Sequence, residues 1–550
     1  MKTKRTNYVF PYLPDILINS QVSGTITNKD NIIIDGSLLF ADLSGFTAMS
    51  EKLSELGRFG GEKLAEIMNG CFDSLLGLTF AAGGDVIKFG GDAFLALFSG
   101  EDSAAKGYNC AGNLINWISR NGKISTPVGD FSLDIHAGIS KGKIYNLYIG
   151  KKRKDHLFCG LAVEKAYAAA DAASLGQLAM TGEAAKAIGN IDVYQTDEGF
   201  FICRDFSNLN VLKPISRPRT DKNVDNSYLE KFIVTGLNEQ LHFNNGVIEG
   251  EHRVLTNLFI GVDSLKKNLE TDIDKSVFAI NNYFDTLNSI ITKHGGAFAR
   301  MDSSGTSEKM LIFFGAPVSS GRDAQNCLKT VLEIESSLPE INKKFIHPIK
   351  HRYGINTGLC FVGDVGGRWR REYTAMGDAV NLAARLMSKA SFGDILIGEQ
   401  TIKICGDDFV THDGGLITVK GKKKPVRIYY LDKQIERDSS TELMIGRDKE
   451  LEAASKFVNK ISSKQRSLLL ISGEPGAGKS LLCAKTKKMA AKAGLINVEG
   501  ACFKHSSDTP YGPLKAILLG LLRLPLKSTQ KRRFFIVFLP NISTQLSSYN

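Results

Sequence analysis

Short apolar runs alternate with longer amphipathic runs along most of the chain. LLFADL, DVIKFG and FLALF are short and rich in branched and aromatic residues, which is typical of strands. The run GGEKLAEIMNGCFDSLLGLTFAA spaces its apolar residues as a helix does. This alternation predicts an α/β sandwich in which helices pack on a sheet.

The same series of blocks occurs twice. SLLFADLSGFTAMSEKL at 37–53 has a weaker counterpart in TNLFIGVDSLKKNL at 256–269. Three glycine-centred blocks follow in the same order in both halves: Gly84 with Gly296, Gly138 with Gly354, and Gly160 with Gly377. A series repeated at a nearly constant offset indicates two diverged copies of one domain. We expect an N-terminal segment at 1–34, a first copy at 35–205, a linker at 206–251 and a second copy at 252–432.

A third unit is expected at 443–550, where a glycine-rich loop joins an apolar run to a helical run. SLLLISGEPGAGKSLLCAK contains the pattern G-x-x-x-x-G-K-S, whose backbone N–H groups can wrap a phosphate. The lysine would reach the terminal phosphates and the serine would hold Mg²⁺. This predicts a P-loop NTPase-like module that binds a second nucleotide. Its nucleotide-binding residues are Gly473, Gly476, Gly478, Lys479 and Ser480.

The end of this unit departs from a complete ATPase core. The apolar run FFIVFLPN at 534–541 lacks the terminal acid that would hold a magnesium-bound water. A basic run precedes it and a Ser-rich end follows it. We therefore interpret the module as truncated and leave ATP hydrolysis by it open.

Composition narrows the class of protein. The chain has 69 Lys+Arg against 58 Asp+Glu, and its net charge of +11 is spread over 550 residues. This favours anionic ligands such as nucleotides, and we predict no nucleic-acid partner. Nine cysteines without a CxxC pair indicate a reduced compartment, with neither a disulfide framework nor a zinc site.

Targeting and membrane segments are not expected. The N-terminus has no long apolar run, and AILLGLLRLPL is interrupted by Arg523 and Pro525 and is too short to span a bilayer. We predict a soluble cytoplasmic protein without a transmembrane segment, and leave association with organelles or the cytoskeleton open.

Three motifs resemble the class III nucleotide cyclases over nearly all of 35–432: FADLSGFTAMSEKL, KFGGDAFLALF and EYTAMGDAVNLAARL. The tandem pair followed by IGRDKELE and a P-loop resembles the soluble, bicarbonate-responsive adenylyl cyclases. The resemblance implies two tandem catalytic domains that form an intramolecular pseudo-heterodimer, so that the chain is a monomer. It also implies conversion of ATP to cyclic AMP and pyrophosphate. In the family a long C-terminal region follows the P-loop module.

The metal-binding residues are expected in the first copy. Attack of a ribose 3′-hydroxyl on an α-phosphate needs two metal ions, and Asp42 and Asp92 match the metal aspartates of the family. We expect two Mg²⁺, with Mn²⁺ or Ca²⁺ as alternatives at one site. A single strand-end aspartate is more often a turn or cap residue. Leu43 completes the expected metal set. The backbone that cradles the phosphates comprises Leu43, Ser44, Gly45, Phe46 and Thr47.

The second copy carries different groups. Asn381 and Arg385 are four residues apart, so they share one face of a helix. In the family the asparagine orients the ribose and the arginine stabilises charge in the transition state. The alternative is an ordinary surface pair on an amphipathic helix.

Each copy lacks the groups that the other has. We expect Val262 in the position of Asp42, with Asp263 one residue off, and the irregular DSSGTSEK in place of Asp92. Conversely, Glu164 and Ala168 stand opposite Asn381 and Arg385. This complementary loss predicts one composite active site between the copies and a second, pseudosymmetric site without activity.

The base-binding residues favour adenine. Arg300 matches the base-recognition lysine of the family and can only donate, which suits N1 of adenine, and Thr374 can accept from N6–H. Ala375 joins them in the expected substrate site, whereas guanylyl cyclases place a glutamate and usually a cysteine at the first two positions. Three alternatives remain: a guanylyl cyclase, a non-catalytic nucleotide sensor coupled to a P-loop ATPase, and a protein whose main activity is the P-loop unit.

Bicarbonate is expected to act weakly. In the animal enzymes a lysine and an arginine of the first copy hold it in the pseudosymmetric site. Lys88 matches the lysine, but Tyr167 stands at the position of the arginine. A neutral hydroxyl is a poorer partner for a planar oxyanion than a charged guanidinium. We predict weak or absent bicarbonate stimulation.

Overall fold

The computed structural model divides the chain into two compact units. One comprises 1–318 with 323–434, and the other comprises 319–322 with 435–550. The residues that the structure describes are 8–22, 31–54, 56, 58–217, 226–243, 246, 248, 250–304, 307–419, 425–434, 447–463, 465–472, 479–502, 514, 517–518 and 534–540.

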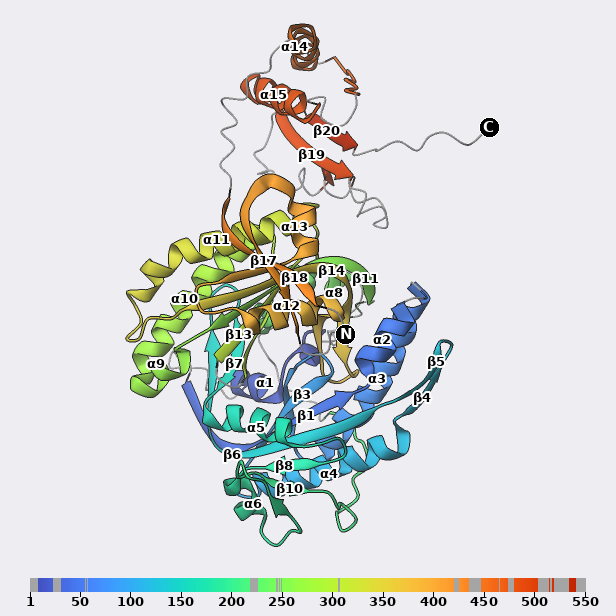
Figure 1. Ribbon diagram of the computed structural model, residues 1–550, viewed down its shortest axis with the longest axis vertical. Coiled ribbons are helices and arrows are strands. Elements are labelled where there is room, and N and C mark those ends of the chain that lie inside the picture. The colour runs from blue at the N-terminus through green and yellow to red at the C-terminus, as the bar shows by residue number, and fades with distance from the viewer. Residues whose placement is uncertain are drawn as a thin grey trace, which may run out of the picture. The chain divides into compact units, whose positions relative to one another are not determined.

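The first copy is built on a mixed, eight-stranded sheet with the strand order β2-β3-β1-β6-β8-β10-β9, and β7 pairs with β6 at its side (Figure 1). Its strands are β1 (Asn31–Ser44), β2 (Asp85–Phe89), β3 (Ala93–Ser99), β6 (Asp134–Ile149), β7 (Asp155–Cys159), β8 (Leu178–Met180), β9 (Tyr194–Gln195) and β10 (Phe201–Cys203). Its helices are α2 (Phe46–Ser54), α3 (Arg58–Ala81), α4 (Ser103–Asn121), α5 (Leu161–Ala172) and α6 (Gly182–Ile188), and β4 (Lys123–Thr126) and β5 (Gly129–Ser132) form a separate hairpin.

The second copy repeats this sheet with the order β12-β13-β11-β14-β16-β18-β17, and β15 pairs with β14. Its strands are β11 (Glu251–Val262), β12 (Ala297–Ser304), β13 (Ser307–Phe314), β14 (His351–Gly366), β15 (Arg371–Met376), β16 (Ile395–Gly398), β17 (Phe409–Ile417) and β18 (Val426–Gln434). Its helices are α9 (Leu265–Thr271), α10 (Ile273–Lys293), α11 (Asp323–Asn342), α12 (Asp378–Lys389), α13 (Glu399–Cys405) and the 3₁₀ turn η3 (Gly406–Asp408). The predicted α/β class and the duplication are both confirmed.

Two glycines explain why the repeat keeps its glycine-centred blocks. Gly138 pairs with Phe40, and Gly354 pairs with Phe259, at matching positions of the two central strand pairs. A Cβ on Gly138 would lie 2.3 Å from the carbonyl oxygen of Ala166, and one on Gly354 would lie 2.1 Å from that of Ala383. Only glycine therefore lets α5 and α12 approach the sheet this closely.

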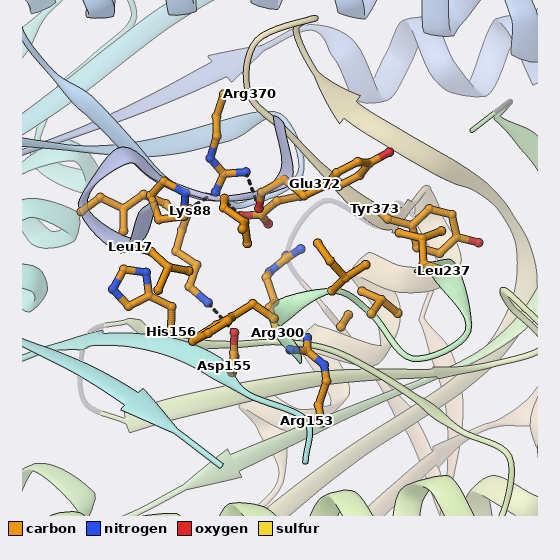
Figure 2. Close-up of a pocket in the computed structure, with 18 residues that line it drawn as sticks. Leu17, Lys88, Arg153, Asp155, His156, Leu237, Arg300, Arg370, Glu372 and Tyr373 are labelled. Atoms are coloured by element: carbon orange, nitrogen blue, oxygen red, sulfur yellow. Dashed lines mark hydrogen bonds and ion pairs between the residues drawn. The ribbon is translucent and has the colours of Figure 1, made fainter. Parts of the chain in front are cut away.

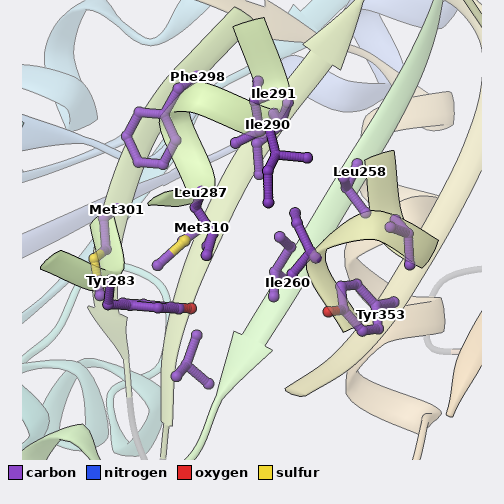
Figure 3. Close-up of a cluster of buried hydrophobic side chains, with 14 of the residues drawn as sticks. Leu258, Ile260, Tyr283, Leu287, Ile290, Ile291, Phe298, Met301, Met310 and Tyr353 are labelled. Carbon is purple, nitrogen blue, oxygen red and sulfur yellow. The ribbon is translucent and has the colours of Figure 1, made fainter. Parts of the chain in front are cut away.

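The core of the second copy extends into the first. The helix α10 turns Ile280, Phe284, Leu287 and Ile291 onto its sheet at the spacing of one helix face. Figure 3 shows Leu287 and Ile291 among the buried side chains of this cluster. The same buried cluster includes first-copy residues, namely Leu147, Ile149, Leu157 and Cys159. The two copies are thus joined by a continuous apolar core, which the hydrophobic effect stabilises.

Segments outside the two sheets complete the first unit. The N-terminal part forms the 3₁₀ turn η1 (Phe10–Tyr12) and α1 (Asp15–Val22). The linker forms α7 (Asn226–Leu229), the 3₁₀ turn η2 (Glu230–Phe232) and α8 (Leu237–Phe243). Residues from both segments share one buried cluster with the second copy.

The second unit contains α14 (Asp448–Ser462), α15 (Lys479–Lys492) and two parallel strands, β19 (Ile496–Cys502) and β20 (Phe534–Pro540). The apolar run near the C-terminus forms the strand β20. In the described parts of the chain, no helix combines the length and the apolar character needed to cross a membrane.

Candidate active site

The two acids of the first copy lie together at one end of its sheet. Asp42 is near the end of β1 and pairs with Ala93, the residue that follows Asp92. Burial, followed by the negative charge of Asp42, raises the pKa of Asp92 to about 7. The imidazole of His136 lies 3.7 Å from the carboxylate of Asp42 and is charged only when protonated. Two carboxylates that repel each other are suited to binding a divalent cation between them. Mg²⁺, for example, is commonly bound by one or two carboxylates together with the phosphates of a substrate.

The segment between β1 and α2 can offer backbone donors. Gly45 has φ = +105°, and a Cβ there would lie 2.5 Å from the carbonyl oxygen of Ser132. Leu43 and Phe46 are buried, and the ring of Phe46 stacks on Phe72. Because these two side chains are buried and fix the turn, they do not themselves face a ligand. The backbone N–H groups at the start of α2 are the groups that can donate hydrogen bonds to an anion. The side chain of Thr47 lies outside the described residues.

Asn381 and Arg385 project from one face of α12. The helix begins after Gly377, whose φ is +127°, and it buries Leu382 and Leu386 on its other side. Both polar side chains are partly exposed. Within the described chain neither makes a side-chain hydrogen bond or ion pair, so both can contact a ligand.

The residues expected to bind the base contact each other. Arg300 on β12 donates from Nη1 to Oγ1 of Thr374 on β15, at 3.0 Å. Its Nε donates to Oδ2 of Asp302 at 2.7 Å. Ala375, next to Thr374, is buried. Asp302 therefore fixes the orientation of the guanidinium, a role that sequence reasoning missed although the acid lies only two residues away.

Arg370 and Glu372 connect the strand β15 to the first copy. Arg370 is 2% exposed and donates to the carbonyl oxygens of Val86 and Ile87 on β2, at 2.9 and 2.8 Å. Glu372 accepts from the N–H of Phe89 at 3.3 Å and from Arg370 at 3.0 Å. These contacts hold β15 against the strand that leads to Asp92. The sequence offered one indication, an arginine-rich run directly before EYTAMGD.

The two residues expected to face bicarbonate lie in one small pocket. Lys88 and Tyr167 line it together with Met301 and Asp302. Lys88 already forms an ion pair with Asp155 at 3.3 Å, and Figure 2 shows this pair. The ring of Tyr167 packs 4.3 Å from that of Phe40. Two acids therefore lie near Lys88, neither of which the sequence reasoning included.

The corresponding region of the second copy corrects one expectation. Gly261 pairs with Lys309 and Arg352, just as Asp42 pairs with Ala93 and His136. Gly261, and not Val262, therefore occupies the position of Asp42. Adjacent residues of a strand lie on opposite faces, so an alignment of two diverged strands that is wrong by one residue assigns the position to a residue on the other face.

An internal ion pair occupies this second region. Lys266 of α9 lies 2.8 Å from Glu164 of α5 in the other copy. Glu308, one residue before Lys309, occupies the position of Asp92 and is buried. Burial, together with the charge of Glu164, raises the pKa of Glu308 to about 7, and Lys266 partly offsets this. Here a lysine of the chain supplies positive charge next to the acids.

Most of the glycine-rich loop lies outside the described residues. Gly473, Gly476 and Gly478 lie outside the described residues, as does the side chain of Ser480. Lys479 is the first residue of α15. The order of loop and helix therefore agrees with the sequence pattern, and nucleotide binding there stays a prediction.

Two protein-family models match different parts of the chain. The family model described as "Adenylate and Guanylate cyclase catalytic domain" matches 29–204 and 250–433. The model described as "AAA ATPase domain" matches 444–533.

Several named adenylate cyclases are similar to part of this chain. "Adenylate cyclase type 10" from Oryctolagus cuniculus is 26% identical over 418 residues, covering 68% of this chain and 25% of that protein. The Homo sapiens protein of the same name is 26% identical over 421 residues, with the same coverage. "Adenylate cyclase 1" from Rhizobium meliloti is 28% identical over 162 residues, covering 28% of this chain and 24% of that protein. The chain spans about a quarter of the length of these relatives.

Two solved structures are similar to part of this chain. The adenylyl cyclase CyaB from P. aeruginosa is 29% identical and covers 34% of this chain and 98% of its own, with a TM-score of 0.32. A class III adenylyl cyclase-like ATP-binding protein from Pseudomonas aeruginosa is 13% identical and covers 69% of this chain and 86% of its own, with a TM-score of 0.47.

Proposed function

This chain belongs to the adenylate and guanylate cyclase catalytic domain family, and from that premise we propose that it converts ATP to 3′,5′-cyclic AMP and pyrophosphate. One observation carries the proposal. The first copy has the carboxylate pair Asp42 and Asp92, and the second has Gly261 and Glu308 at those positions. The helix α12 has Asn381 and Arg385, where α5 has Glu164 and Ala168. Such reciprocal loss is expected if a single composite site between the copies does the chemistry, within one monomer.

In this proposal Asp42 and Asp92, with the main chain at Leu43, hold two divalent cations, most simply Mg²⁺. The cations would activate the ribose hydroxyl and neutralise the triphosphate. The N–H groups from Ser44 onward bind phosphate oxygens. Asn381 orients the ribose, and the guanidinium of Arg385 stabilises the charge that develops on the α-phosphate.

Adenine fits the donors that remain in the base pocket. Asp302 and Thr374 engage Nε and Nη1 of Arg300, which leaves Nη2 to donate to N1 of adenine. The hydroxyl oxygen of Thr374 has a second lone pair that can accept from N6–H. Guanine presents N–H donors at N1 and N2, which Arg300 cannot accept.

Analysis of the nucleotide products tests the proposal. The purified chain is incubated with ATP or GTP and with Mg²⁺ or Mn²⁺, and an Asp42→Asn variant serves as the control. Cyclic AMP as the main product, lost in the control, supports the proposal. A preference for GTP would overturn the base assignment. No cyclic nucleotide under any condition would favour a nucleotide sensor coupled to the P-loop unit.

A further inference from the structure

Each of the two sheets ends in an edge strand that bears on the proposed site. The strand β2 lies at one end of the first sheet and leads to Asp92, and β12 lies at the matching end of the second and carries Arg300. Both strands have a β-bulge at the same position of the repeat, where Ile87 in β2 and Ala299 in β12 are left out of the pairing register. A bulge at a sheet edge changes the direction of the side chains that follow it.

An acid of the opposite copy accepts the same backbone N–H group on each edge strand. Oε1 of Glu372 accepts from the N–H of Phe89 in β2 at 3.3 Å. Oδ2 of Asp155 accepts from the N–H of Met301 in β12 at 2.8 Å. The two donors lie at matching positions of the repeat, and so do the two acceptors. The same contact is therefore made twice, once in each direction between the copies, and it satisfies a group that an edge strand leaves unpaired.

A cation holds each of these acids in place. Arg370 lies 3.0 Å from Glu372 and also donates to two backbone carbonyl oxygens of β2. Lys88 lies 3.3 Å from Asp155. Figure 2 shows both ion pairs. Asp155 is 6% exposed and Arg370 is 2% exposed. Hydrogen bonds are stronger in such a buried environment than in water, so these contacts are suited to fixing the two strands.

The two contacts hold different parts of the proposed site. Phe89 lies three residues before Asp92, whereas Met301 directly follows Arg300. The strands that carry the acids are held by their own sheets, since β15 pairs with β14 and β7 pairs with β6. Loss of one acid side chain therefore frees the edge strand of the opposite copy and leaves the strand of the acid itself in place.

We propose that Glu372 and Asp155 are positioning residues, each of which holds a functional strand of the opposite copy. Glu372 orients the hairpin that carries Asp92, and Asp155 orients β12 with Arg300. Neither acid needs to touch the substrate for this role. The inference rests on the proposed function for the roles of Asp92 and Arg300. It gives a reason why the two copies act together, since each copy supplies the group that fixes the edge strand of the other.

Binding measurements test the proposal without requiring turnover. The full chain carries Lys479→Ala, so that the glycine-rich loop does not contribute nucleotide binding. Electron paramagnetic resonance measures Mn²⁺ affinity with a saturating non-cyclisable ATP analogue, and competition with the matching GTP analogue measures the preference for adenine. Glu372→Ala is expected to weaken Mn²⁺ binding by roughly tenfold or more and to leave the adenine preference unchanged. Asp155→Ala is expected to lower the adenine preference by roughly tenfold and to leave Mn²⁺ binding unchanged.

Two kinds of control variant separate positioning from a general loss of the interface. Asp73 of α3 also joins the copies, because it accepts from the N–H and Nε of Arg368 at 2.6 and 2.9 Å. This contact does not run through an edge strand, so Asp73→Ala should change neither quantity. Glu372→Gln and Asp155→Asn keep an acceptor for the backbone N–H and are expected to restore most of the binding.

The crossed pattern decides the outcome. A parallel fall of both quantities in both alanine variants, or an equal effect of Asp73→Ala, would overturn the proposal. Amide variants as impaired as the alanine variants would also overturn it, because charge and not the bond to the backbone would then matter. Glu372→Met and Asp155→Leu lack the acceptor at similar volume and replace an alanine variant that does not fold. The crossed shifts in a chain that makes no cyclic nucleotide would support positioning and contradict the proposed function alone.

Discussion

Glu308 of the second copy occupies the sheet position that Asp92 occupies in the first. Each directly precedes the residue that pairs with the end of the central strand, Lys309 with Gly261 and Ala93 with Asp42. Both carboxyls have a pKa raised to about 7, but their surroundings differ. Asp92 faces the acid Asp42, whereas Glu308 lies near Lys266 and Glu164. The acids of the first copy therefore suit a metal ion, whereas in the second copy the side chain of Lys266 supplies the positive charge near the corresponding position.

Glu308→Gln is expected to change how stability depends on pH. The pKa of Glu308 is about 7 in the folded chain, so between its unfolded value near 4.5 and about 7 the folded chain binds more protons. The free energy of unfolding therefore falls as pH rises through this window. The variant loses that dependence and should be more stable than the unmodified chain at pH 8, by up to roughly 3 kcal/mol. The difference should be small near pH 4.5.

Denaturant midpoints at pH 5 and pH 8 measure this effect. Glu198→Gln is the matched control, because Glu198 is exposed. An unchanged pH dependence in Glu308→Gln would show that Glu308 is not protonated on folding.

Asp42→Asn and Asp92→Asn are each expected to abolish cyclic AMP synthesis. Both changes keep the side-chain volume and remove the charge that would balance a divalent cation. Turnover with Mg²⁺ and Mn²⁺ is the measurement, with circular dichroism to check the fold. Near-normal synthesis by both folded variants would remove the two-metal assignment.

Arg385→Ala is expected to lower kcat by about 10²-fold or more and to change KM much less. An interaction made mainly in the transition state behaves in this way. Steady-state kinetics with ATP separate the two parameters. Glu164→Gln, at the matching helix position in the pseudosymmetric region, should leave kcat largely unchanged. An effect of Arg385→Ala on KM alone would mean that Arg385 only binds ground-state ATP.

Lys479→Ala is expected to leave cyclic AMP synthesis by this chain largely intact. Lys479 belongs to the second compact unit, whereas the proposed cyclase residues all lie in the first. Binding of a nucleotide analogue to the second unit should be lost. A folded variant without cyclase activity would instead reveal control of the cyclase by the P-loop unit.

Bicarbonate is expected to stimulate the chain weakly or not at all, and Tyr167→Arg should increase the response. Tyr167 offers one neutral hydrogen bond, and Lys88 is already paired with Asp155. Loss of a charge-assisted bond corresponds to about ten- to a hundredfold in affinity. Cyclic AMP production is measured against bicarbonate concentration at fixed pH and ionic strength. Strong stimulation of the unmodified chain would show that Tyr167 does not impair the site.

The sequence alone determined the architecture and the family. Apolar periodicity and the repeated glycines predicted two α/β copies, because the close approach of α5 and α12 leaves no room for a side chain at Gly138 and Gly354. Local motifs also identified the candidate residues Asp42, Asp92 and Arg385, since each lies within a short motif of its own segment.

Tertiary structure decided what depends on contacts between distant segments. The register put Gly261, and not Val262, in the position of Asp42, because inter-strand pairing is set by the whole sheet. The ion pair of Lys266 with Glu164 joins residues that are far apart in the chain. The raised pKa of Glu308 likewise appears only in the folded chain, because burial and the charges of distant segments decide the pKa of a carboxyl.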